Sequence, residues 1–141
     1  MSDVSDEILV RPAHIRDVKS LGTLIEPFVI QKILLPRTID ELALLLPNYF
    51  VAETSGKIIG CAALEIYSSK LAELRSLVVH PDYQHRRVGH QLVAACLERA
   101  REEQVLEVMA ITSAEAFFVS CGFDFTLPGQ KKALFFQTRD S

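Results

Sequence analysis

The 141-residue sequence has no tryptophan and only three cysteines, Cys61, Cys96 and Cys121, which lie far apart. It contains no Cys-x-x-Cys pair and no cluster of cysteine and histidine, so we predict no metal site. Isolated cysteines in mostly apolar surroundings are typical of reduced, buried residues. The first residues, MSDVSDEILV, lack the basic start and the apolar core of a signal peptide. We therefore expect a cytoplasmic protein.

Long apolar runs and an excess of positive charge are also missing. No uninterrupted apolar segment approaches the roughly 18 residues that indicate a membrane span. Fifteen Lys and Arg stand against eighteen Asp and Glu, which gives a net charge of −3 and no basic field for sequence-independent nucleic-acid binding. We expect neither a membrane nor a nucleic acid as a partner. The length suits a single domain over residues 1–141 with a core of its own.

Hydrophobic periodicity predicts an α/β protein in which helices and strands alternate along the chain. Strands are expected at residues 8–10, 49–54, 57–67, 71–79, 105–111, 123–127 and 133–138, and helices at residues 14–28, 39–46, 88–104 and 114–121. Thr38 and Glu41 have the spacing of a capping box, and Gly122 suits the left-handed residue that ends a helix. The pattern indicates one mixed central sheet of about six to seven strands, flanked by about four helices.

The segment from Leu71 to His90 carries the strongest indication of function. An apolar strand runs into a short basic turn, and the turn opens a long amphipathic helix. Such a junction presents unpaired N–H groups and the positive end of a helix dipole, and Gly89 lets a ligand approach the backbone. Arginines at a helix N-terminus are electrostatically unfavourable, because that end of the helix dipole is positive, unless a bound anion compensates them. The residues alone therefore favour a diphosphate site over a solvated helix cap.

This junction resembles motif A of the GCN5-related N-acetyltransferases, whose pattern is Gln/Arg-x-x-Gly-x-Gly/Ala. Gln84 and Gly89 occupy its first and last positions, and Arg87 replaces the middle glycine. Leu77 to Pro81 resembles the family's strand whose backbone pairs with the pantetheine arm, and Phe117 to Phe123 resembles motif B. The resemblance covers nearly the whole chain. It implies the GNAT fold, acetyl-CoA (coenzyme A) as cofactor, and a homodimer through the last strands as one possible assembly.

The same resemblance implies which residues contact the cofactor. These predicted contacts are Leu77, Val78, Val79, Gln84, His85, Arg86, Arg87, Val88, Gly89, His90 and Phe118. Phe118 stands where many relatives have a tyrosine that protonates the departing thiolate. Because phenylalanine cannot donate a proton, the thiolate either leaves unassisted or is protonated by another donor, such as Tyr83 or a water.

Two predicted catalytic groups follow from the family's cofactor strand. Glu73 matches the glutamate that serves as general base in some members, and a base is needed because an ammonium group must lose a proton before it attacks. The alternative is a surface glutamate paired with Arg75 or Lys70. A backbone N–H near Leu77 is implied as the group that stabilises the oxyanion.

A narrower resemblance concerns the acceptor. Four segments, LLPR at 34–37, YFVAE at 49–53, GCAAL at 60–64 and AELRSL at 72–77, together resemble the acetyltransferase domain of N-acetylglutamate synthase, an enzyme of arginine biosynthesis. An amino-acid substrate needs cations for its carboxylates, and Arg37 and Arg75 are the candidates. Ser113 stands where that enzyme usually carries an arginine or a polar substitute that helps to hold the substrate.

Three functions therefore stay open. The leading hypothesis is N-acetylation of a small amino acid, glutamate-like first. A second is acetylation of another amine, such as a polyamine, a protein lysine or an N-terminus. The third is a non-catalytic acyl-CoA-binding module. It is supported by Arg87 and Phe118, which stand where the family usually has a glycine and a tyrosine.

Overall fold

The computed structural model describes residues 7–125, 129 and 133–138. The chain forms two compact units, Met1–Ile111 and Thr112–Ser141. The first contains nearly all of the regular secondary structure, and the second contains one short helix, α4 (Glu115–Ser120). A single domain over residues 1–141 stays a prediction.

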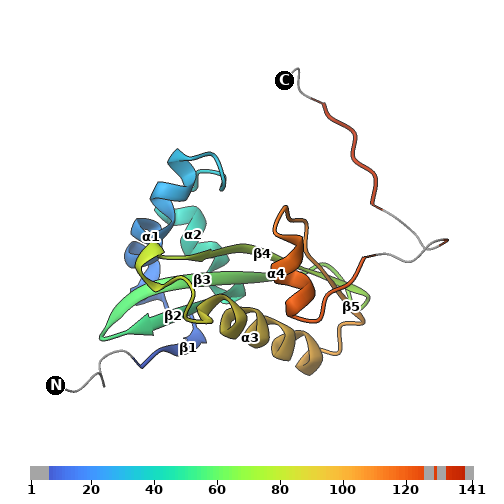
Figure 1. The fold of residues 1–141 in the computed structure, drawn as a ribbon. Coiled ribbons are helices and arrows are strands. Elements are labelled where there is room, and N and C mark those ends of the chain that lie inside the picture. Colours follow the sequence, from blue (N-terminus) through green and yellow to red (C-terminus); the bar gives the residue numbers. More distant parts are fainter. Residues whose placement is uncertain (1–6, 126–128, 130–132, 139–141) are drawn as a thin grey trace. The chain divides into compact units, whose positions relative to one another are not determined.

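The first unit is built on a five-stranded sheet in the order β1-β2-β3-β4-β5 (Figure 1). Its strands are β1 (Leu9–Pro12), β2 (Tyr49–Thr54), β3 (Lys57–Ile66), β4 (Leu71–Val79) and β5 (Glu107–Met109). The first four are antiparallel neighbours, whereas β5 runs parallel to β4. The helices of this unit are α1 (Val18–Ile30), α2 (Ile39–Leu45) and α3 (Val88–Glu102).

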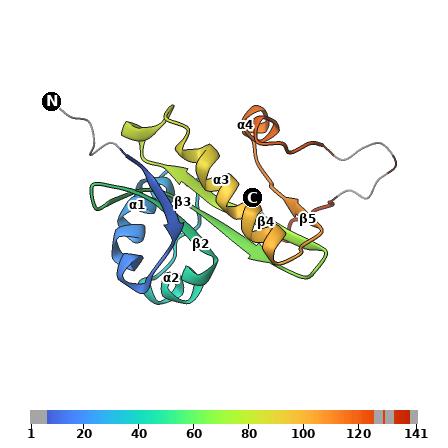
Figure 2. The ribbon, with the colours of Figure 1, turned by 90° about the horizontal axis from the view of Figure 1, so that it is seen from below.

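The helices of the first unit cover the two faces of its sheet. Helices α1 and α2 lie on one face and α3 lies on the other (Figures 1 and 2). On the first face, Leu21, Leu42 and Cys61 belong to one buried cluster. On the second face α3 approaches β3 closely, because a Cβ at Gly60 would lie 3.1 Å from Leu92 and 3.2 Å from Val88. This close packing fixes the start of α3 beside the end of β4.

The expected α/β class, the mixed sheet and the four helices are confirmed. The capping box is also confirmed: Thr38 Oγ1 accepts from the Glu41 amide at 3.1 Å, and Glu41 Oε1 accepts from the Thr38 amide at 2.7 Å. Gly122 has a φ of 98° just after α4, as its place in the sequence predicts. None of the described helices is long and apolar enough to cross a lipid bilayer.

The two predicted strands at the end of the chain are wrong. Residues 123–125 and 133–138 have no regular secondary structure, and residues 126 and 127 lie outside the described residues. The described sheet therefore has five strands, not six or seven. An alternating apolar pattern shows only that a segment can be extended, whereas a strand also needs a hydrogen-bonded neighbour. Leu134 and Phe136 are about nine-tenths exposed, so this apolar pattern is not buried.

A partly buried ion network ties β1 and β2 to the chain that leads into α1. The Arg11 guanidinium donates two hydrogen bonds to the Asp17 carboxylate, at 2.8 and 3.0 Å, and one to Glu53 at 2.6 Å. The His14 amide also donates to Asp17, at 2.7 Å. The hydrogen bonds from Arg11 are the main reason that the pKa of Asp17 falls from 3.8 to about 2.

We expect Asp17→Asn to lower the free energy of unfolding at pH 7 by about 2 kcal/mol, the value of a pKa depression of this size. The contribution is present above the unfolded-state pKa of 3.8 and is lost as the pH falls through the folded-state value of about 2. Urea unfolding between pH 7 and pH 2 should show the variant and the native protein converging below pH 4. Glu26→Gln, at an exposed position of α1, is the control. If the free energies of unfolding of Asp17→Asn and the native protein differed by the same amount at every pH, the ion network would not be the source of the difference.

Candidate active site

The end of β4 is joined to the start of α3 by a compact turn. A short 3-10 helix, Pro81–Tyr83, follows the strand, and its first free amide, that of Asp82, donates to His80 Nδ1 at 3.1 Å. The side-chain amide of Gln84 donates to the Val79 carbonyl at 3.2 Å. Gln84 therefore holds the turn against the end of the strand, a role for its side chain that the sequence does not reveal.

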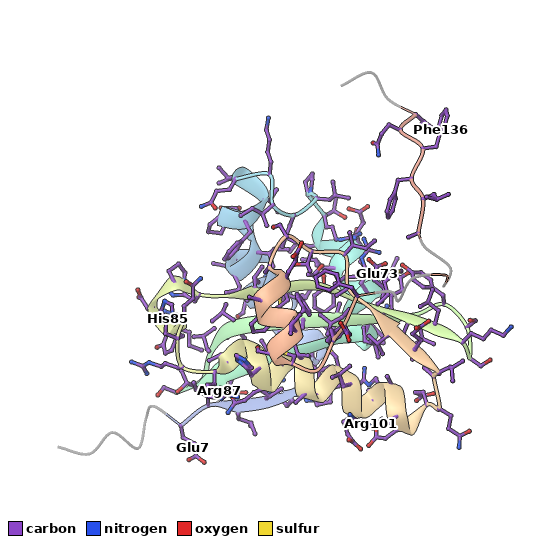
Figure 3. The ribbon with its side chains drawn as sticks, turned by 45° about the vertical axis from the view of Figure 1, so that its right-hand side comes forward. Glu7, Glu73, His85, Arg87, Arg101 and Phe136 are labelled. Carbon is purple, nitrogen blue, oxygen red and sulfur yellow. The ribbon has the colours of Figure 1, made fainter. Side chains whose placement is uncertain are left out.

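The backbone of this turn suits an anion. His85 and Arg87 are both left-handed, with φ values of 68° and 63°, and Arg87 directly precedes α3. No side chain accepts a hydrogen bond at the N-cap of α3, and its first turn contains no acidic residue. A left-handed residue next to a helical one makes successive N–H groups converge, and the helix dipole adds positive potential there. Figure 3 shows His85 and Arg87 at this same end of the sheet.

The side chains of the turn are accessible. Gln84, His85, Arg86 and Arg87 are exposed, and Gly89 is partly exposed. The Arg86 guanidinium lies over the Tyr83 ring, 5.4 Å from its centroid. The predicted cofactor residues of the turn are thus exposed and lie around the N-terminus of α3.

The conformation of Arg87 leads to a prediction. A side chain in the left-handed region costs about 1–2 kcal/mol, which glycine avoids at some cost in chain entropy. Arg87→Gly should therefore raise the free energy of unfolding by about 0.5–1 kcal/mol, while the loss of charge weakens coenzyme A binding severalfold. Urea unfolding and calorimetric titration measure the two effects. Arg86→Gly, where φ is not positive, removes the same charge and should weaken binding without the gain in stability.

Strand β4 contains a β-bulge at Ser76 and Leu77. Cys61 pairs with Val78 and Ala63 pairs with Arg75, so two residues of β4 face one residue of β3. Ser76 is left-handed, with a φ of 54°. A bulge of this kind bends the strand and leaves backbone groups outside the ladder.

Among the described residues, no strand pairs with the opposite edge of β4 beyond Glu73. Strand β5 pairs with β4 only from Leu71 to Glu73. Leu77, Val78 and Val79, the predicted contacts of the pantetheine arm, lie beyond that point. The described sheet therefore offers an unpaired strand edge that leads from the bulge to the turn at Gln84, and this is the arrangement that an extended pantetheine arm needs.

A small open pocket lies on the face of the sheet that carries α1 and α2. It is lined by Arg37, Leu45, Asn48, Tyr49, Ala63, Glu65, Arg75 and Ser76. The pocket thus brings together Arg37 and Arg75, the two predicted substrate-binding cations, which are far apart in the sequence. Tyr49 is buried, and this burial raises the pKa of its phenol.

The two arginines of the pocket differ in their partners. Arg75 Nη1 donates to Glu65 Oε1 at 2.8 Å, and both side chains are more than a third exposed. Within residues 7–125, Arg37 forms no ion pair. Arg37 is therefore the pocket's more available cation for a carboxylate of the substrate.

Glu73 lies on the same face of the sheet as Glu65 and Arg75. It is paired directly with Glu65 in the β3–β4 ladder, and paired residues point to one face. The Tyr67 hydroxyl donates to Glu73 Oε1 at 2.6 Å, which raises the pKa of Tyr67. The alternative to a catalytic role was a surface glutamate paired with Arg75 or Lys70. In the structure the hydrogen-bond partner of Glu73 is Tyr67, and the ion pair of Arg75 is with Glu65. Figure 3 shows Glu73 well removed from His85 and Arg87.

Two predicted site residues belong to the second unit. Ser113 is exposed, and Phe118 is buried with its ring edge-on to Phe117 and Phe123, at centroid distances of 5.1 and 5.2 Å. Their roles toward substrate and cofactor stay predictions. Among the described residues, no group of three or more His, Cys, Asp or Glu is placed to hold a metal ion.

Sequence reasoning missed Tyr49 and Glu65 as pocket residues. Both lie on strands whose alternation is visible in the sequence, so the face that each occupies could be predicted. That these two residues line one pocket with Arg37 and Arg75 could not be predicted, because it depends on the pairing register of three strands and on the loop before α2.

A family model described as the acetyltransferase (GNAT) family matches residues 23–123. The chain belongs to this family. The fold and the family resemblance are therefore confirmed, and the protein is an acetyltransferase that uses acetyl-CoA.

Three proteins of known name or structure are similar to this chain. The structure of Rv2747 from Mycobacterium tuberculosis, solved in complex with CoA, is 31% identical, has a TM-score of 0.79, and is aligned over 89% of this chain and 76% of its own. An amino-acid acetyltransferase of Pasteurella multocida is 32% identical over 129 residues, which are 87% of this chain and 29% of that protein. An N-acetylglutamate synthase from Neisseria gonorrhoeae, complexed with coenzyme A and N-acetylglutamate, is 27% identical with a TM-score of 0.74, over 81% of this chain and 27% of its own. The chain thus spans less than a third of the latter two proteins.

Proposed function

We propose that the protein transfers an acetyl group from acetyl-CoA to the α-amine of a small, glutamate-like amino acid. The observation that carries this proposal is the pocket in which Arg37 and Arg75 meet beside the bulge of β4. Relatives named amino-acid acetyltransferase and N-acetylglutamate synthase support it. Arginine biosynthesis, a cytoplasmic location and a homodimer remain predictions that accompany it.

One pocket residue and two groups of β4 outside the pocket lining have proposed tasks. Arg37 binds a carboxylate of the amino acid through paired charge-assisted hydrogen bonds. Glu73 takes a proton from the α-ammonium, directly or through a water, so that the nitrogen lone pair can form the new C–N bond. The Leu77 N–H donates to the thioester oxygen as negative charge develops there. The C–S bond then breaks, the sulfur leaves as coenzyme A thiolate, and the nitrogen of the new amide gives its second proton to the thiolate or to water.

The turn and the open edge of β4 hold the acyl donor in this proposal. Its diphosphate binds at the N-terminus of α3, and its extended arm runs along Val79 and Val78 toward Leu77. This order places the thioester at the bulge, where the pocket of Arg37 begins.

Thiol release in the presence of acetyl-CoA and a panel of free amino acids and amines tests the proposal. We expect glutamate or glutamine to be acetylated, and Arg37→Ala to lower kcat/KM for that amino acid by about 10- to 100-fold, the value of a hydrogen-bonded charge. Arg101→Ala, exposed near the end of α3, is the control (Figure 3). Acetylation of a polyamine or a peptide amine that Arg37→Ala leaves unchanged would favour the alternative acceptor class.

A further inference from the structure

The bulge residue Ser76 is held in an unfavourable conformation. It is a non-glycine residue with a φ of 54°. Such a conformation costs about 1–2 kcal/mol and persists only where the surrounding structure imposes it. The contacts of Ser76 should therefore show which groups impose its left-handed conformation.

A buried side chain on the neighbouring strand holds Ser76 at its carbonyl. The Cys61 thiol, on β3, donates to the Ser76 carbonyl with a sulfur–oxygen distance of 3.4 Å. Cys61 is 0% exposed, so this anchor is fixed by the core.

The contact with Cys61 also determines where the next amide points. The Ser76 carbonyl and the Leu77 N–H belong to one planar trans peptide group, in which they point in opposite directions. A carbonyl directed at the buried Cys61 sulfur therefore directs the Leu77 N–H away from that sulfur. Val78 pairs with Cys61 in the β3–β4 ladder, so the backbone is held on both sides of Leu77.

The Cys61 contact is present at any pH at which the enzyme would work. Burial raises the pKa of this thiol to about 12, so at neutral pH the sulfur carries the proton that it donates to Ser76. The strength of an oxyanion-stabilising N–H depends on its being aimed before the charge develops. A rigid anchor beneath Leu77 meets that requirement.

We infer that Cys61 is a positioning residue that acts through Ser76 to aim the Leu77 N–H at the acyl oxygen. It does not need to touch the acyl donor or the acceptor. The inference rests on the proposed function for its kinetic consequence, but the orientation of the Leu77 amide can be measured without an acceptor.

The first test uses ¹⁵N-labelled protein titrated with acetyl-CoA alone. In the native protein the Leu77 amide resonance should shift on binding, and in Cys61→Ala this shift should fall by at least half while the resonances of the turn at Gln84–His90 respond as before. Cys96→Ala is the matched control, because it removes an equally buried thiol beneath the other face of the sheet. An unchanged Leu77 response in Cys61→Ala would overturn the inference.

The second test is kinetic. Cys61→Ala should lower kcat roughly tenfold, which is less than the loss of about 10²–10³ from removing an oxyanion donor, with KM for acetyl-CoA within twofold. Cys61→Ser keeps a donor at this position and should recover part of the activity. A loss matched by Cys96→Ala would show a merely structural role. If no amine is acetylated but the Leu77 amide responds as expected, the proposed acceptor is wrong and the inference stands.

Discussion

Glu73→Gln should lower kcat for amino-acid acetylation by about 10²–10³-fold, within the range that a positioned general base contributes. The substrate's α-amine is an ammonium at neutral pH, and the glutamine amide cannot take its proton. Glu73 lies on the face of the sheet that forms the Arg37 pocket, and the Tyr67 hydroxyl fixes one of its oxygens at 2.6 Å. Because Glu73 lies apart from the turn that precedes α3, the affinity for coenzyme A should not change.

The pH dependence separates a lost base from a damaged structure. In Glu73→Gln the residual rate should keep rising with pH as solvent deprotonates a growing fraction of the amine, whereas the native enzyme should reach a plateau earlier. Steady-state thiol release between pH 6 and pH 10 measures both profiles, with Glu102→Gln, exposed on α3, as the control. An unchanged kcat would mean that Glu73 is a surface carboxylate whose task is its hydrogen bond with Tyr67.

The cofactor half of the site could be predicted from the sequence because it is local. The strand that ends at Val79, the basic turn and the helix that begins at Val88 are consecutive, and their chemistry follows from adjacency. The replacement of a glycine by Arg87 is also understandable from the structure. The residue adopts the left-handed conformation that glycine prefers, so the backbone of the turn is kept and the difference lies in strain and charge.

The acceptor half could be predicted only in part because it is assembled across strands. Arg37 and Arg75 were expected to act together, and they do line one pocket. The sequence could not show which carboxylate pairs with Arg75, because Glu65 and Glu73 both lie on neighbouring strands and point to the same face of the sheet. Only the register decides that Glu65 meets Arg75 while Glu73 meets Tyr67.

The bulge shows most clearly where sequence reasoning ends. Cys61 was expected to be a core cysteine, and it is fully buried. Its contact with the Ser76 carbonyl depends on a register shift between β3 and β4, and no residue pattern announces that shift, because Ser76 and Leu77 continue an ordinary strand sequence. A glycine at position 76 would have indicated a left-handed conformation, whereas a serine gives no such indication.

Gly89→Pro should lower the affinity for coenzyme A by at least about 100-fold, because it removes one N–H from the anion site and distorts another. Gly89 is the second residue of α3. A proline there also drives Val88, the first helical residue, out of the α region, although Val88 is 1% exposed and packs near Gly60. The start of the helix must then shift by about one residue, away from the turn that Gln84 holds against β4.

Calorimetric titration with coenzyme A measures this effect, since the protein has no tryptophan to report binding by fluorescence. Gly89→Ala is the matched control: it keeps the N–H and favours the helix, so its affinity should stay within a few-fold of the native value unless the added methyl meets the ligand. Circular dichroism of Gly89→Pro establishes that the variant is folded. A folded Gly89→Pro protein that binds coenzyme A like the native one would mean that the basic turn is only a solvated helix cap. The diphosphate would then have to bind through side-chain charge alone, and Arg86 and Arg87 would matter more than the N-terminus of α3.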